Sequence, residues 1–409
     1  MLKNNITPLE KEPAFALSDK YTTLESLRDF YRDGLLNDTL PFWIPKAIDL
    51  KYGGYQTALG RDGTVIHPDK PVWFQGRFAW LLATLYQTAE KRPEWLQYSR
   101  HGIDFINSHC FDEDGRMFFS LTREGQPLRK RRYIFSETFA IIALAAYGKA
   151  SGDHTFIQQA LDLFRKTVQM LQEPGCLSPK TNPQTRPMKG LAVPMIMIVT
   201  AQELRKAAPL PELDQWIDFY IAEVRRDFVK PEFQCVLETV GPEGEFYDTF
   251  DGRMICPGHS IELGWFILHE AKHRGNDPEL KQLGQQIVDW SWEWGWDKKF
   301  GGLLYYTDCK NLPCTEYWSD MKFWWPHNEA IIATLLAWHL TKEESYLQKH
   351  ALVHDWAYQH FHDQEYGEWF GYLHRDGSVA TELKGNMWKG PFHLPRMQWY
   401  CWQLLCHSQ

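Results

Sequence analysis

The amino-acid sequence predicts an all-α fold, a closed toroid of six helical hairpins or (α/α)6 barrel, with short β-hairpins on one rim. Glycine turns recur about every 60 residues, for example at Gly54, Gly115 and Gly175, and the chain of 409 residues holds about six such units. Between the turns, apolar residues recur at helical spacing in paired segments. In a closed ring each unit buries its apolar face on its neighbours, so a chain of this length can form one domain.

Each glycine turn begins a short apolar run that predicts a β-hairpin. Because these runs occupy the same place in each unit, we expect the hairpins to gather on one rim, around the mouth of a cavity. An open α-solenoid is the competing fold, but the recurrence of hairpins and the end of the chain after about six units favour closure. The hairpin runs are 51–63, 111–125, 235–244, 300–308 and 365–377.

In each predicted pair, the first helix is more apolar around its circumference and the second has a clearer polar face. The first helices are therefore predicted to line the ring and the second helices to cover it. The sequences 151–153 and 275–277 supply stop and start signals between partners. The predicted pairs are 75–90 with 94–109, 136–149 with 154–171, 261–274 with 279–294, and 328–340 with 344–360.

The composition excludes several classes of partner. Lys and Arg total 44 and Asp and Glu total 52, and the net charge of −8 argues against a nucleic-acid partner. No apolar run reaches the roughly 18 residues of a spanning helix, so no membrane partner is expected. Residues 1–20 lack the apolar core of a secretory signal and are predicted to form an N-terminal tail, with one catalytic domain over 21–409. The eight cysteines are scattered, which favours reduced thiols and a cytoplasmic location.

Common catalytic motifs are absent from the sequence. It has no phosphate-binding loop, dinucleotide fingerprint, serine-hydrolase elbow or zinc-protease helix, and no ligand spacing that demands a metal. Aromatic residues make up 15% of the chain, with 19 Trp. This content fits either a stiff core or a cleft that stacks flat ligands.

Polar residues at the starts of predicted inner helices are the candidates for a site. Arg77 can hold a hydroxyl or carbonyl oxygen, or it can form a structural salt bridge. His259 and Glu262 follow a Pro-Gly break and, being three residues apart, share one helix face that points toward the mouth. The alternative is a His bonded to a backbone carbonyl and a Glu that caps the helix.

Two later segments add further candidates. Glu329 follows Trp324-Trp325, and a carboxylate beside an apolar run is hard to explain by packing, although a Trp pair is more often core. His393 lies in a loop shaped by proline and glycine, where a plain surface position is the alternative. Histidine has an ordinary pKa near neutral pH, so His259 and His393 are candidate proton carriers, and His327 is expected to be structural.

At these segments the sequence resembles the N-acylglucosamine 2-epimerase family, whose animal members are also called renin-binding proteins. The similarity runs from about residue 24 to residue 403 and includes long stretches rich in Trp and Gly. The matching stretches are 53–55, 73–77, 134–137, 186–195, 257–262, 322–329, 365–373 and 389–396.

The resemblance implies an (α/α)6 barrel and inversion of C2 in an open-chain sugar, with no redox cofactor. A base removes the C2 proton, a cis-enediolate forms, and a proton returns to the opposite face. By family position, His259 and His393 are the two proton carriers, and Arg77 holds oxygens where negative charge develops. Glu262 is expected to orient or recharge His259. The resemblance makes Glu329 a polar wall residue and Trp325 and Trp388 stacking aromatics.

The family has branches with different substrates. In the cellobiose 2-epimerase and aldose–ketose isomerase branches, an inner-helix segment carries Asn followed by His, whereas here 191–196 has no His. This favours interconversion of N-acetyl-D-glucosamine and N-acetyl-D-mannosamine. The alternatives are a 2-epimerase or aldose–ketose isomerase of unmodified hexoses such as glucose and mannose, and a non-catalytic carbohydrate- or protein-binding barrel.

Two departures from the family pattern bear on the site and on activation. Cys256 stands where Asn is usual, and Gln184 stands where Gly is usual in a segment associated with nucleotide activation. ATP as an activator that is not consumed is therefore in doubt, and no cofactor is expected for the chemistry itself. Related enzymes are often dimers, so the resemblance also implies a homodimer.

Overall fold

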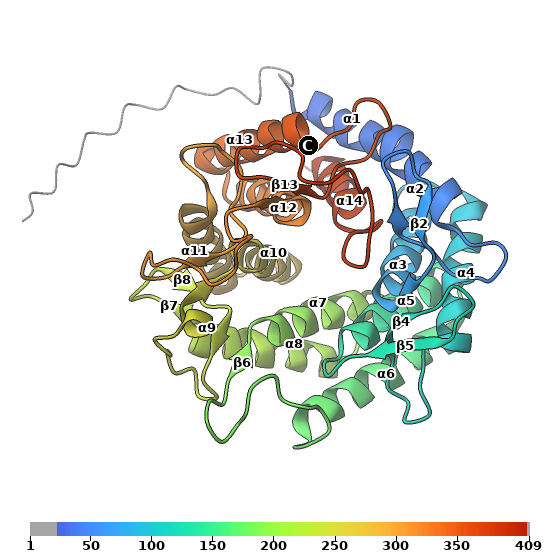
Figure 1. Ribbon diagram of the computed structural model, residues 1–409, viewed down its shortest axis with the longest axis horizontal. Helices are drawn as coiled ribbons and strands as arrows, with labels where there is room; N and C mark the ends of the chain where they lie inside the picture. The colour runs from blue at the N-terminus through green and yellow to red at the C-terminus, as the bar shows by residue number, and fades with distance from the viewer. Residues whose placement is uncertain (1–22, 407–409) are drawn as a thin grey trace, which may run out of the picture.

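The long helices of the computed structural model, which describes residues 23–406, stand in two concentric rings (Figure 1). The inner ring comprises α3 (Val72–Thr88), α5 (Phe135–Ser151), α7 (Ala192–Ala207), α10 (Pro257–His273), α12 (Trp324–Thr341) and α14 (His393–Cys406). The outer ring comprises α4 (Pro93–His109), α6 (His154–Gln172), α8 (Pro211–Glu223), α11 (Pro278–Gly295), α13 (Glu344–His360) and α1 (Leu24–Gly34). All four predicted helix pairs are confirmed, and the predicted tail over 1–20 lies outside the described residues.

The composition of the inner helices explains their position. The first 14 residues of α12, from Trp324 to Ala337, are all buried, so this helix has no polar face for solvent. In α3, Gly76 lets the backbone of α5 approach closely, since an added Cβ would lie 2.4 Å from the carbonyl oxygen of Phe139. The outer helices bury one side only: α6 alternates exposed and buried residues at helical spacing.

The sixth unit differs from the predicted hairpin. Five inner helices are each followed in the chain by their outer partner, but α14 is the last described helix and has no successor. Instead α1, from the start of the described chain, packs behind α14, which also contacts α12 and α3. The ring is therefore closed by helices from the two ends of residues 23–406, so its last unit is not a hairpin.

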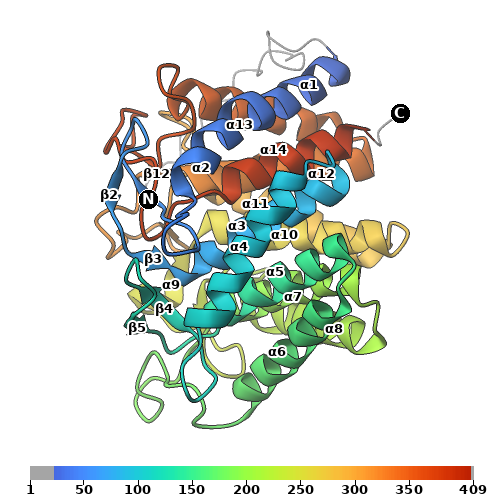
Figure 2. The ribbon, with the colours of Figure 1, turned by 90° about the vertical axis from the view of Figure 1, so that its right-hand side faces the viewer.

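The short strands gather on one rim, as predicted (Figure 2). One sheet has three strands in the order β3-β4-β5, and the others are the pairs β1-β2, β6-β9, β7-β8, β10-β11 and β12-β13. Several of these pairs join neighbouring units, so backbone hydrogen bonds connect the units along the rim. The strands are β1 (Ala58–Leu59), β2 (Val65–His67), β3 (Lys70–Pro71), β4 (Phe118–Leu121), β5 (Pro127–Lys130), β6 (Lys189–Gly190), β7 (Val229–Lys230), β8 (Cys235–Val236), β9 (Thr239–Val240), β10 (Met254–Ile255), β11 (Thr307–Asp308), β12 (Lys322–Phe323) and β13 (Tyr372–Leu373). Short helices complete the rim and the ring: α2 (Leu40–Ala47), α9 (Phe250–Arg253), and the π-helical turns η1 (Leu35–Thr39) and η2 (Val224–Phe228).

A buried Asp–Lys pair recurs in three of the rim turns. The carboxylate of Asp297 lies 3.1 Å from the Lys322 ammonium, which also donates to the carbonyl of Gly302. The carbonyl of Asp297 accepts a hydrogen bond from Gly301, whose φ of +70° suits glycine. Arg375, from the next unit, donates to the same carboxylate. The equivalent sets are Asp49, Lys70 and Arg123, and Asp363, Lys384 and Arg61.

These ion pairs connect turn geometry to the packing of neighbouring units. Asp363 pairs with Lys384 and also with Arg61, so the last rim turn is bonded to a residue of the first unit. Beside it, Lys389 donates to Glu368, which accepts a second hydrogen bond from the indole of Trp43. The loop that leads into α14 is thus held by residues of the first unit, which fixes where α14 begins.

No helix within residues 23–406 is both long and apolar enough to cross a membrane. All eight cysteines are free, and five of them are buried.

We expect Asp297→Asn to lower the free energy of unfolding by about 3 kcal/mol at pH 7, because it leaves Lys322 buried without its counter-charge. Burial opposes the charge of Asp297, but its hydrogen bonds with Arg375 and the backbone and its pairing with Lys322 hold its pKa well below the usual value. The stabilisation is therefore present above about pH 4 and is lost as pH falls. Urea denaturation of both proteins between pH 7 and pH 3 measures the difference.

The matched control is Asp320→Asn, which removes an exposed carboxylate 4.0 Å from the same arginine, Arg375. An exposed pair contributes little, so this variant should unfold like the unmodified chain. Equal stability of Asp297→Asn and Asp320→Asn at pH 7 would contradict the structural role of the buried pair.

Candidate active site

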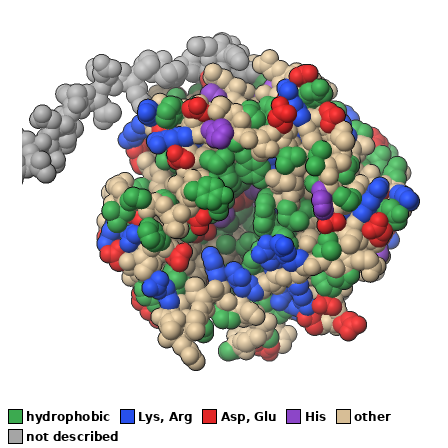
Figure 3. Space-filling model, in the orientation of Figure 1, with side chains coloured by type: hydrophobic (Ala, Val, Ile, Leu, Met, Phe, Trp, Pro, Cys, Tyr) green, Lys and Arg blue, Asp and Glu red, His purple; other side chains and the backbone are tan. Residues whose placement is uncertain are grey.

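The ring encloses a cavity of about 670 Å³ that opens at the centre of the hairpin rim (Figure 3). This volume lies in the range of small-molecule sites. All six inner helices contribute to its wall, because their first turns meet below the rim. Side chains that line it include Trp73, Arg77, Phe139, Met195, His259, Glu262, Trp325, His393 and Arg396.

His259 lies in the first turn of α10 and is held from behind by Glu238. Its Nδ1 is 2.9 Å and 3.1 Å from the two carboxylate oxygens of Glu238. Because an ionised carboxylate only accepts, Nδ1 carries a proton and donates it. Burial alone would lower the pKa of His259, but its interactions with Cys256 and Glu238 outweigh burial and raise the pKa well above the usual value. The direction of this shift favours the protonated imidazole, which suits His259 to donate a proton into the cavity.

His393 opens α14 and also has a carboxylate behind it. Its Nδ1 donates to Glu329 over 2.6 Å, and the other oxygen of Glu329 accepts from the indole of Trp265. Burial and the adjacent Arg396 cation lower the pKa of His393 well below its usual value. A neutral imidazole with its proton on Nδ1 has a lone pair on Nε2, so His393 can accept a proton.

Trp325 lies beside both histidines. Its ring centroid is 4.9 Å from that of His259 and 5.8 Å from that of His393. The close fit depends on Gly258, where an added Cβ would lie 2.7 Å from the Trp325 ring. One flat aromatic surface therefore spans the two groups that can exchange protons with a ligand.

Arg77 is a buried cation without a salt bridge. Its guanidinium packs on aromatic rings, 4.1 Å from the centroid of Phe139 and 4.5 Å from that of Phe392. Within residues 23–406 no carboxylate lies within ion-pairing distance of it, and its Nε has no hydrogen-bond partner. Burial lowers the pKa of Arg77 to about 9, which still leaves it charged at neutral pH. Of the two readings of Arg77, the structural salt bridge is wrong, and the side chain is free to hold a ligand oxygen.

At the mouth, Trp388 is 45% exposed and packs edge-on against Trp73 at a centroid distance of 5.7 Å. Nearby, the hydroxyl of Tyr372 is hydrogen-bonded to the side chain of Asn386, and both residues line the cavity. Their positions suit contacts with the outer part of a ligand.

The structure places six of the seven predicted site residues on the cavity wall: Arg77, His259, Glu262, Trp325, Trp388 and His393. Glu329 is the exception. It is fully buried behind His393, so it positions that histidine and is not part of the wall. The expected role of Glu262 is also wrong, because Glu262 accepts from Arg396 over 2.7 Å and the carboxylate that holds His259 is Glu238.

Two charged residues were missed by the sequence reasoning. Arg396 follows His393 by three residues on α14, and this spacing was a signal for a shared helix face. No sequence spacing of this kind links Glu238 to His259. Its carbonyl accepts from Leu191 and its N–H donates to Met254, so it is carried to α10 by strand contacts that join residues far apart in the chain.

Two groups of described side chains could hold a metal ion: Glu238 with Cys256 and His259, and Glu262 with Glu329 and His393. The second group already contains a cation. Nη2 of Arg396 lies 2.7 Å from Glu262 and 2.6 Å from Glu329. The guanidinium therefore supplies the positive charge that these carboxylates need.

The segment associated with nucleotide activation offers no enclosed phosphate site. Residues 182–186 are exposed. Lys189, a cation next to them, is paired with Glu223 and Asp227. An exposed loop and a lysine already paired with two carboxylates do not form a site that fits a nucleotide.

The model of one protein family, N-acylglucosamine 2-epimerase, matches residues 53–393. The bovine N-acylglucosamine 2-epimerase is 34% identical over 376 residues, which cover 90% of this chain and 89% of the bovine protein. The human enzyme is 33% identical over 381 residues, with 90% and 88% coverage.

Solved structures share the fold. The cellobiose 2-epimerase from Spirochaeta thermophila superposes with a TM-score of 0.81 at 21% identity, covering 94% of this chain and 97% of that one. A D-mannose isomerase gives a TM-score of 0.80 at 18% identity, with 97% and 100% coverage. From the family match over most of its length and the identity to the mammalian enzymes, the chain belongs to the N-acylglucosamine 2-epimerase family.

Proposed function

We propose that this protein interconverts N-acetyl-D-glucosamine and N-acetyl-D-mannosamine by deprotonation and reprotonation at C2. The observation that carries the proposal is the pair of histidines beside Trp325, each with Nδ1 bound to a carboxylate. Two titratable groups whose surroundings push their pKa values apart are suited to act as base and acid. The names of the mammalian relatives support the same substrates.

In the proposed reaction, Nε2 of His393 takes the proton from C2 of the open-chain sugar. The electron pair moves toward C1 and its oxygen, which gives an enolate with the acetamido group on C2, and its negative charge lies near Arg77. His259 then delivers its Nε2 proton to the other face of C2. The reverse reaction starts from the opposite protonation states, with His259 as base and His393 as acid. Each general acid–base contribution is worth about 10²–10⁴-fold in rate.

The two carboxylates position the histidines in this proposal. Glu238 and Glu329 each bind Nδ1, which leaves both Nε2 atoms for the sugar. Burial and the positive charge of Arg396 lower the pKa of His393, and Arg396 also ties Glu262 to the same network. Arg77 binds the developing oxyanion more strongly than the neutral sugar, so it favours the intermediate.

The apolar first two turns of α7 favour an N-acylated substrate over an unmodified hexose, whereas the polar lining residues of α7, from Thr200 onward, follow later in the helix. Met195, Ile196 and Val199 line the cavity there with apolar surface. Such surface can bury the methyl group of an acetamide but leaves a sugar hydroxyl without a hydrogen bond. Epimerisation of an unmodified hexose is the second candidate.

We also infer that residues 23–406 form a single catalytic domain with the (α/α)6 architecture. The support is that contacts between neighbouring inner helices continue around the whole ring, from α3 through α14 and back to α3. Eight free cysteines support a cytoplasmic location. Self-association into a homodimer remains a prediction from the family resemblance.

Proton NMR in D₂O tests the substrate. With N-acetyl-D-glucosamine we expect the manno epimer to appear together with deuterium at C2, because the returning proton comes from solvent. Parallel samples contain ATP, or D-glucose in place of the amino sugar. If N-acetyl-D-glucosamine gains neither C2 deuterium nor the manno epimer with or without ATP, the proposed substrate is wrong, and turnover of glucose would identify the second candidate.

Single-histidine variants test the two-base mechanism. We expect His259→Asn and His393→Asn each to reduce epimerisation at least about 100-fold. Each remaining histidine should still exchange the C2 hydrogen of the one epimer that faces it, without inversion. The two variants should therefore exchange opposite epimers, as measured by NMR in D₂O.

The control for these variants is His67→Asn, at an exposed position on β2. It should epimerise at the unmodified rate. Retained epimerisation in both active-site variants would exclude the mechanism, and exchange of the same epimer by both variants would exclude the assignment of opposite faces.

The pH dependence of kcat/KM should be bell-shaped. Activity falls on the acid side as His393 gains a proton and on the alkaline side as His259 loses one. Glu238→Gln removes the carboxylate that stabilises the His259 imidazolium, which lowers its pKa. We therefore expect the alkaline limb to move to lower pH and the acid limb to stay in place, while exposed Glu232→Gln leaves both unchanged. An unmoved alkaline limb in Glu238→Gln would contradict the role given to this pair.

A further inference from the structure

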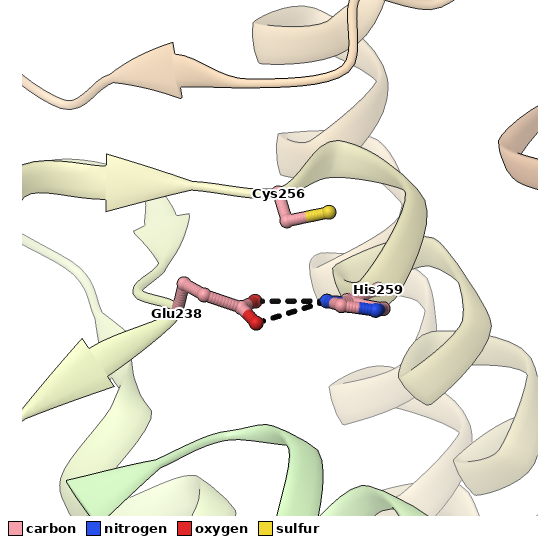
Figure 4. Close-up of side chains that lie close together, drawn as sticks. All are labelled: Glu238, Cys256 and His259. Carbon is pink, nitrogen blue, oxygen red and sulfur yellow. Dashed lines mark hydrogen bonds and ion pairs between the residues drawn. The ribbon is translucent and has the colours of Figure 1, made fainter. Parts of the chain in front are cut away.

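Glu238, Cys256 and His259 bring three different donor atoms together at the cavity wall (Figure 4). A carboxylate oxygen, a thiol sulfur and an imidazole nitrogen all lie within 4.8 Å of one another. Figure 4 shows the sulfur of Cys256 above the line that joins the Glu238 carboxylate to the His259 ring. The histidine and its carboxylate form the proton-transfer pair, and the thiol is not itself a proton carrier in the proposed reaction.

The backbone fixes the three donors in place. Cys256 is the N-cap residue of α10, and its carbonyl accepts from Ser260 within the first turn. His259 follows three residues later on the same turn. Glu238 is tied to this point through its hydrogen bond to the carbonyl of Met254. The donor geometry therefore needs no rearrangement of the chain to form.

Burial leaves the group open on one side. Cys256 is fully buried, whereas the side chains of Glu238 and His259 are 15% and 26% exposed. Of the three, His259 lines the cavity, together with the neighbouring Tyr305 and Tyr306. The partly exposed side chains of Glu238 and His259 give an ion access to the group. An ion bound at Nδ1 would lie on the side of the imidazole away from Nε2 and the sugar.

The donor set selects the kind of ion. Sulfur and imidazole nitrogen with one carboxylate oxygen suit Zn²⁺ and similar thiophilic cations. Mg²⁺ and Ca²⁺ take oxygen ligands and would gain little from the sulfur. Three protein ligands and one open position also match the coordination of accessible zinc sites. The other candidate group, around Glu329, differs because Arg396 already lies among its carboxylates.

We propose that Glu238, Cys256 and His259 form a binding site for a thiophilic divalent cation such as Zn²⁺, and that the bound ion takes His259 out of proton transfer. Coordination by Nδ1, the thiolate and the carboxylate releases the thiol proton and the Nδ1 proton to solvent. Nε2 keeps its proton, so the metal-bound imidazole cannot act as the base. Giving up that proton would leave an imidazolate, so the metal-bound imidazole is also a much weaker acid than the imidazolium. The inhibitory consequence rests on the proposed function, whereas metal binding itself does not.

Cobalt binding to the full chain tests the site directly. Co²⁺ replaces Zn²⁺ in such sites and reports a sulfur ligand by a thiolate-to-cobalt absorption band in the near ultraviolet. We expect one equivalent of this band in the unmodified protein, displaced by Zn²⁺, and its loss in Cys256→Ser. The matched control is Cys176→Ser, which removes an exposed thiol that also lies beside a carboxylate, Glu173.

Inhibition is measured as the ratio of activity with and without Zn²⁺ in each variant. We expect the Zn²⁺ concentration for half inhibition to rise at least about tenfold in Cys256→Ser, in line with the loss of one ligand, and to stay unchanged in Cys176→Ser. A cobalt band that survives Cys256→Ser, or inhibition that is independent of Cys256, would overturn the site. A cobalt band that depends on Cys256 in a protein without epimerase activity would instead refute the proposed function alone.

Discussion

The architecture depends on one constraint: the inner helices have no polar face to give to solvent. A helix such as α12, buried along its first 14 residues, needs apolar neighbours on both flanks and a cover behind it. A closed ring meets this need for every unit at once. Where the two ends of residues 23–406 meet, α1 covers α14 from behind and α14 contacts α3, so α14 is also enclosed. Closure also brings all the inner helix starts to one rim, where their first turns form the cavity.

Two similar pairs acquire opposite charge states within that cavity. His259 and His393 each lie at the beginning of an inner helix, and each donates Nδ1–H to a carboxylate. The difference comes from the neighbours. Cys256 and Glu238 together raise the pKa of His259 against its burial, whereas Glu329 is shared with Arg396 and does not offset the burial of His393. Electrostatics beyond the first hydrogen bond therefore separates a proton donor from a proton acceptor.

Most of the fold and half of the site chemistry were accessible from the sequence. Helix periodicity and the glycine turns predicted the paired helices and the rim hairpins, because both depend on local spacing. The two histidines and Arg77 could be placed at helix starts for the same reason. Glu238 could not, since only the strand contacts at Leu191 and Met254 bring it to α10. The roles of Glu262 and Glu329 were misassigned because a carboxylate's partner depends on tertiary packing. The closing of the last unit by α1 likewise involves residues from opposite ends of the chain.

The unpaired charge of Arg77 has a consequence for ligand discrimination. A neutral sugar gives this guanidinium no ion-pair partner in its aromatic enclosure, so the guanidinium lacks one in the empty and in the substrate-filled cavity alike. A planar anion of the same size would neutralise it. Sugar acids and other anionic mimics should therefore bind more tightly than the sugars they resemble, and their affinity should weaken as salt screens the attraction. The same feature that assists turnover makes the cavity a natural target for charged competitive inhibitors.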